Sequence, residues 1–129
     1  MFNIVFNAHR AVGPIGGFSI GNVDFVVDLT VNHTAGGTKD AMNDGIEALD
    51  VGSKVTIHLN PVVQSVEMDV LASASPWTVE FFDSSGISLA VRPVAPHGRK
   101  LLNLAASSIA KIECKTINNE AYIYEMRGN

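Results

Sequence analysis

The chain has 129 residues, the size of one domain, and its 47% hydrophobic and 17% charged residues are typical of a packed globular protein. Nine basic residues against thirteen acidic ones give a formal net charge of −4, and the sequence has no cluster of Lys and Arg. This balance argues against a nucleic-acid partner, because such binding rests on cations that neutralise phosphates.

No apolar run reaches the ~18–20 residues that a membrane-spanning helix needs, so no membrane span is expected. The start, M-F-N-I-V-F-N-A-H-R, has neither the basic region nor the apolar region of a signal peptide. The single cysteine, Cys114, has no partner for a disulfide within the chain. We therefore expect a protein that is cytoplasmic or exported without a cleaved signal peptide.

The first 53 residues combine short strands with a long irregular loop. Alternating apolar side chains predict a short strand over residues 2–6 and a long half-buried strand over residues 18–31. Residues 39–49 are compatible with at most one short helix, for which Thr38 is a suitable cap. An extended loop with one helical turn is the alternative, since Gly45 costs such a helix ~1 kcal/mol.

From residue 54 onward, alternating apolar and polar residues recur at a spacing of about ten residues, with turn signals between them. Pro61 is expected to end the first of these strands, and the run Asp83-Ser84-Ser85-Gly86 is typical of a hairpin turn. The seven predicted strands cover residues 55–60, 66–70, 77–81, 87–91, 100–104, 109–117 and 121–126. Residues 1–129 are therefore predicted to form one antiparallel β-sandwich of jelly-roll type with about eight or nine strands, residues 54–126 supplying the seven-strand repeat.

Short connections make consecutive strands antiparallel, so successive connections fall at opposite ends of the sandwich. One end receives tight turns and the other receives the longer polar loops, where binding residues tend to lie. A sugar packs its C–H groups on an aromatic ring and bonds its hydroxyls to side chains such as Arg and Asn. The candidate ligand-binding residues at the loop-rich end are Trp77, Arg92, His97, Arg99, Asn118 and Asn119.

These candidates also have structural interpretations. Trp77 is in phase with Val79 and Phe81, as a core residue would be. His97 and Arg99 are equally typical of an exposed loop. Cys114 alternates with apolar residues and is expected to be a buried, inert thiol.

Carboxylates in the irregular segment make calcium the one cofactor to consider, because calcium prefers oxygen ligands. They are Asp40, Asp44, Glu47 and Asp50. Their spacing differs from that of an EF-hand loop, and a solvated acidic loop is the alternative. The histidines show no ligand spacing for zinc, and no nucleophile–base pair is visible, so the sequence favours a non-catalytic protein.

Three runs of the sequence are similar to the strands of a known family. They are V-T-I-H-L-N-P-V-V-Q-S-V-E-M-D-V, W-T-V-E-F-F-D-S-S-G-I-S-L-A and I-A-K-I-E-C-K-T-I-N-N-E-A-Y-I-Y-E-M, and Asp44-Gly45 precedes the first. They resemble galactose-binding-like jelly-roll modules, which bind sugars, lipids or proteins through end loops and include purely structural members. The matching positions are turn and core positions, namely Pro61, Asp83, Gly86, Ile109 and Ile112. The resemblance thus implies the fold and assigns no binding residue.

Two functions are compatible with these observations. The first is a non-catalytic binding module that takes a saccharide at the loop-rich end. The second is a structural or assembly module that oligomerises or docks on a protein partner. In the last strand Ala121 and Ile123 already supply an apolar face, so Tyr122, Tyr124 and Met126 predict the interface of a homo-oligomer. The alternative is that both faces of this strand are buried within one subunit.

Overall fold

The structure is a computed structural model that describes residues 1–6, 17–21, 23–28, 38–40, 47–51, 54–116 and 121–129. Its strands are β1 (Phe2–Val5), β2 (Gly17–Ile20), β3 (Val23–Asp28), β4 (Thr38–Asp40), β5 (Glu47–Asp50), β6 (Lys54–Ala72), β7 (Trp77–Phe82), β8 (Ser88–Val94), β9 (Gly98–Lys115) and β10 (Ala121–Gly128). All strand pairs among them are antiparallel, and none of the described residues makes a helix long and apolar enough to cross a membrane.

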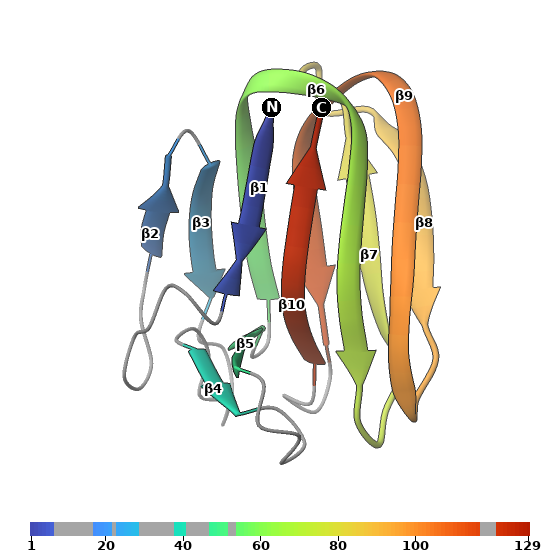
Figure 1. The fold of residues 1–129 in the computed structure, drawn as a ribbon. Helices are drawn as coiled ribbons and strands as arrows, with labels where there is room; N and C mark the ends of the chain where they lie inside the picture. Colours follow the sequence, from blue (N-terminus) through green and yellow to red (C-terminus); the bar gives the residue numbers. More distant parts are fainter. Residues whose placement is uncertain (7–16, 22, 29–37, 41–46, 52–53, 117–120) are drawn as a thin grey trace.

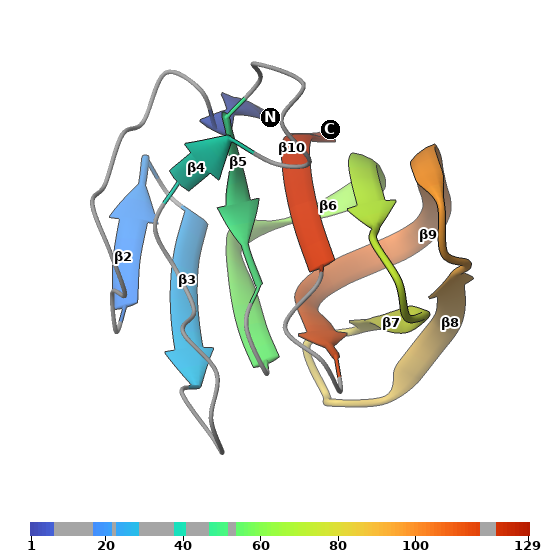
Figure 2. The ribbon, with the colours of Figure 1, turned by 90° about the horizontal axis from the view of Figure 1, so that it is seen from below.

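The two longest strands, β6 and β9, each run through both layers of a sandwich (Figure 1). The first layer has the order β2, β3, first half of β6, second half of β9, β7 and β8. The second layer has the order β4, β5, β10, second half of β6 and first half of β9, and β1 also pairs with β10. Figure 2 shows the two layers from below, joined by the curved paths of β6 and β9. This arrangement confirms the predicted antiparallel β-sandwich.

The bends of β6 and β9 correct two predicted strand boundaries. Pro61 was expected to end a strand, and residues 100–104 and 109–117 were expected to be separate strands. Instead, β6 and β9 each continue, and the ladder between them changes register between His58 and Ser65. Proline removes one donor from a ladder, and such an interruption lets a strand bend without ending it.

Where the structure describes residues 39–49, it places strands and not the one short helix that the sequence allowed. Residues 38–40 and 47–50 are the strands β4 and β5, and residues 41–46 lie outside the described residues. Leu49 pairs with Ile123 of β10 and is fully buried. Pairing with a distant strand therefore overrides a weak local preference for helix.

The core lies between the two layers and is built by the alternating residues of each strand. Ile57, Met68, Phe81, Ile112 and Ile123 are all 0% exposed. Burial of such a side chain stabilises the fold by about 1.5–3 kcal/mol. The core thus fixes which face of every long strand remains available to solvent or to a partner.

Candidate functional site

Two described loops, residues 73–76 and 95–97, lie at the same end of the sandwich, whereas the tight turn at residues 83–87 lies at the other end, as the parity of antiparallel strands predicts (Figure 1). The N–H of His97 donates a hydrogen bond of 3.0 Å to the carbonyl oxygen of Ala72, which joins residues 73–76 to residues 95–97. Both segments lie at the lower end in Figure 1, which we call the loop end. The bends of β6 and β9 and both chain termini lie at the upper end, which we call the bend end.

Trp77 belongs to the core. Its side chain is only 2% exposed, and its Nε1–H donates a buried hydrogen bond of 3.1 Å to the carbonyl oxygen of Leu71. A ring that stacks on a sugar needs a free face, and this ring has none. Trp77 is therefore buried in the core, as its alternative interpretation expected, and offers no free ring face for stacking.

Three other predicted ligand-binding residues lie on β8, in the loop after it and at the start of β9. Arg99 makes a bidentate pair with Asp69, in which its Nε lies 3.2 Å from Oδ1, and its guanidinium carbon lies 3.8 Å from the centre of the Tyr124 ring. His97 is exposed and has a φ of 69°, which is uncommon for a residue other than glycine. Arg92 is half-buried on β8. Two further candidates, Asn118 and Asn119, lie outside the described residues.

The predicted interface residues of the last strand do not form one surface. The ladder between β10 and β6 changes register between Ile123 and Glu125, so Tyr124 is an extra residue in a β-bulge. Tyr124 is 1% exposed, in a small cluster with Ala48 and Leu71, and Tyr122 is half-buried against it. Met126 is 0% exposed on the opposite, core side. Tyr124 and Met126 are thus buried on opposite faces of this strand within one subunit.

The calcium prediction falls largely on residues outside the described part of the chain. Asp44 lies outside it, and only the backbone is described at Asp40, Glu47 and Asp50, on β4 and β5. Among the residues that the structure does describe, no group of three His, Cys, Asp or Glu side chains is placed to hold a metal ion. Calcium binding therefore stays a prediction from the sequence.

One side of the sandwich, at the right in Figures 1 and 2, has strand edges without a partner among the described residues. β8 pairs only with β7. Residues 98–105 of β9 pair only with β6, because β7 pairs with β9 farther along, at residues 111–115. We call the surface formed by β8 and by residues 98–105 the open side. Its free N–H and C=O groups are a template for another strand.

The core is incompletely covered along the open side. Among the described residues, six half-buried hydrophobic side chains pack against the core. Four of them lie on the open side, namely Leu89, Ala90, Leu102 and Leu104, and Ala106 follows next to it on β9. Val91 and Leu101, on the same two strands, are 50% and 54% exposed. The open side therefore combines unpaired backbone with apolar side chains.

Two cations lie on the core side of these edge strands. Arg92 is paired across the ladder with Val79, and Lys100 with Val70, and both valines are 0% exposed. Residues directly opposite each other in a ladder share one face of the sheet, so Arg92 and Lys100 lie on the inner face. Inward-pointing charges on edge strands hinder uncontrolled pairing between sheets.

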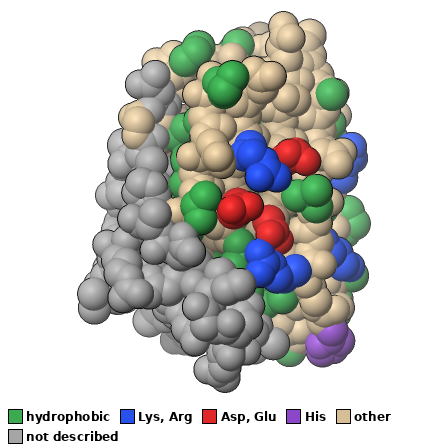
Figure 3. All heavy atoms as spheres, in the orientation of Figure 1, with side chains coloured by type: hydrophobic (Ala, Val, Ile, Leu, Met, Phe, Trp, Pro, Cys, Tyr) green, Lys and Arg blue, Asp and Glu red, His purple; other side chains and the backbone are tan. Residues whose placement is uncertain are grey.

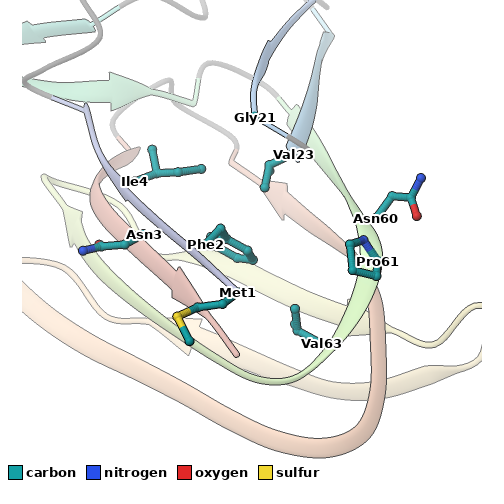
Figure 4. A pocket seen from close by; sticks show the side chains of 9 residues that line it. All are labelled: Met1, Phe2, Asn3, Ile4, Gly21, Val23, Asn60, Pro61 and Val63. Atoms are coloured by element: carbon teal, nitrogen blue, oxygen red, sulfur yellow. The ribbon is translucent and has the colours of Figure 1, made fainter.

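A pocket of about 300 Å³ lies at the bend end, between β1 and the bend of β6 (Figure 4). Its walls are mixed, with the apolar side chains of Phe2, Ile4 and Pro61 and the polar side chains of Asn3 and Asn60 among them. None of the side chains that line it is an acid, a base or a nucleophile. Sequence reasoning missed this pocket because β1 reaches the bend only through pairing with β10.

The open side was also missed, although its strands were predicted. Alternation in the sequence identifies β8 and residues 100–104 as strands, but it contains no information on which strand lacks a neighbour. The signal that could have found it is the run K-L-L-N-L-A-A, which is apolar on both faces of a predicted strand.

Comparison with protein-family models finds no match for this chain, and no curated protein matches it in sequence.

Proposed function

We propose that this chain is a non-catalytic assembly module that associates with further copies of itself through the open side. The observation that carries the proposal is the placement of half-buried apolar side chains: of the six described ones that flank the core, four lie on the open side. A second copy laid against this side would remove them from water, at about 25 cal/mol per Å² of apolar area. It would also give partners to the free edges of β8 and β9.

Carbohydrate binding at the loop end is the weaker of the two functions. Trp77 is in the core, and the guanidinium of Arg99 is already engaged by Asp69 and Tyr124. Among the described aromatic residues of the loop end, Tyr122 retains some exposure, but it is half-buried in an apolar cluster. A sugar would therefore find no free ring and would compete for an occupied arginine.

The proposal is tested by substituting Leu104, which is half-buried on the open side and is paired with the core residue Val66. Light scattering over a range of concentrations should give the wild type a mass above that of the monomer, and Leu104→Glu should be a monomer, because a carboxylate there would be buried by the second copy. Val62→Glu is the matched control, because Val62 is 45% exposed at the bend end. It should behave like the wild type.

A second substitution keeps the test valid if Leu104→Glu fails to fold. Leu101 is 54% exposed on the same edge strand, so Leu101→Glu leaves the core intact and should also weaken association. A wild type that stays monomeric at every concentration would contradict the proposal. An oligomer that persists in both glutamate variants would contradict it equally.

A further inference from the structure

The open side is the basic part of an otherwise acidic protein. Between Asp83 and Glu113 the chain has no acidic residue but four of its nine cations, while the rest of the chain has five cations and all thirteen carboxylates. β8 and residues 98–105 lie within this stretch. Figure 3 shows basic and hydrophobic side chains along the right-hand edge, without an acidic one, and the acidic side chains of this view nearer its centre.

Two of these cations have no counter-charge in the described part of the chain. Arg99 is paired with Asp69, and Lys111 lies 3.4 Å from a carboxylate oxygen of Glu113. Within the described part of the chain, no side-chain hydrogen bond or ion pair involves Arg92 or Lys100, although both residues are half-buried. A carboxylate brought to them by a partner would form charge-assisted hydrogen bonds.

This charge pattern distinguishes between two ways in which copies can associate. A two-fold symmetric contact would place the open sides of two copies against each other, and so would bring their unpaired cations together. Like charges across an interface cost free energy, whereas opposite charges favour encounter and fix the register. A contact that pairs Arg92 and Lys100 with opposite charges therefore needs a different, acidic surface on the second copy.

From this juxtaposition of free strand edges and unpaired cations we propose that copies associate head to tail. The basic open side of one copy contacts an acidic surface of the next, whose carboxylates pair with Arg92 and Lys100. This inference rests on the proposed function and adds the direction of assembly to it. The net charge of −4 on each copy does not prevent the contact, since charges beyond about 8 Å are largely screened at physiological salt.

The first test compares two double variants that remove the same charge. Arg92→Gln/Lys100→Gln should weaken association about tenfold and flatten its dependence on salt between low and high NaCl concentrations. Lys54→Gln/Lys115→Gln is the matched control, because these lysines lie near Glu113 in the first layer, away from the open side. The control should stay close to the wild type.

The outcomes of this comparison separate the two proposals. Equal weakening in both double variants would show an effect of net charge and overturn the inference. The inference also fails if Arg92→Gln/Lys100→Gln associates like the wild type while Leu104→Glu does not associate, a result that leaves the proposed function standing. A wild type that stays monomeric would contradict both the proposed function and this inference.

The second test detects the direction of assembly by mixing. A labelled Leu104→Glu variant has a blocked open side but an intact acidic surface, so in a head-to-tail contact it should bind unlabelled wild type and cap it. In a two-fold contact the blocked side would be needed, and the variant would not bind. Binding by analytical ultracentrifugation with fluorescence detection supports the inference, and absence of binding to an oligomerising wild type overturns it.

Discussion

Cys114 shows how burial removes the chemistry of a single residue. Its side chain is 0% exposed within the core, and this burial, with a smaller contribution from the neighbouring negative charge of Glu113, raises the pKa of the thiol well above its ordinary value of 9.0. The thiolate is the nucleophilic form, so Cys114 is inert in the folded protein. The alternation of apolar and polar residues predicted this buried thiol, because every second side chain of a strand lies on the same face.

The raised pKa of Cys114 predicts a dependence of stability on pH. In the unfolded chain the thiol ionises above pH 9.0, whereas in the folded chain it keeps its proton. The contribution of the thiol is thus fully present below that pH, and the free energy of unfolding should fall as pH rises above it, by up to ~1.4 kcal/mol per unit. Denaturant unfolding at pH 8 to 10 should give a steeper decline for the wild type than for Cys114→Ala. Equal slopes would contradict this account.

Other residues could not be placed from the sequence. The phase of Trp77 allowed either a core or a surface role, and the hydrogen bond from Nε1 to Leu71 depends on a loop that returns the chain to its own preceding strand. The pairing of Arg99 with Asp69 joins residues thirty positions apart across the ladder of β6 and β9. Such partners are set by register, which a local pattern does not encode.

At the scale of elements, β1 is attached to the sandwich through its ladder with β10. Phe2 is opposite Gly128 at the end of this ladder, and a Cβ atom at position 128 would overlap the Phe2 ring. The absence of a side chain at Gly128 therefore allows the ring to lie over the backbone of β10. Gly128 thus allows β1 and β10 to approach each other closely, and it is not part of a turn.

The contact between Phe2 and Gly128 predicts a coupled pair of substitutions. Gly128→Ala should displace the Phe2 ring and lower the free energy of unfolding by about 1–3 kcal/mol. In Phe2→Ala the ring is absent, so adding Gly128→Ala to that variant should cost little further. Thermal or denaturant unfolding of the two single variants and the double variant measures the coupling. Strictly additive losses would show that the ring and the glycine do not interact.

The strands themselves could largely be predicted, whereas their joining could not. Val66, Met68 and Val70 alternate with polar residues and form a strand as expected. The sequence divided β6 and β9 into two strands each, because proline and small polar residues at the bends are also typical of turns. Whether such residues end a strand or bend it depends on the partner strand, and β6 and β9 bend together.

At the scale of the whole molecule, the fold leaves one side of its core less covered than the rest. Strands β6, β7 and β10 are paired on both sides, and the edges of β8 and of residues 98–105 are unpaired within the described chain. The same side carries the unpaired cations Arg92 and Lys100. The proposed association between copies rests on these three features: an incompletely covered core, free strand edges and a local excess of positive charge.

The most direct test of this account is hydrogen exchange measured at low and high protein concentration. Backbone amides on a free strand edge exchange rapidly, and they become protected when another chain covers them. We predict that protection at residues 98–105 and in β8 rises with concentration, while that of the fully paired strand β10 stays constant. Protection that is independent of concentration along the whole open side would contradict the central claim that a second copy binds there.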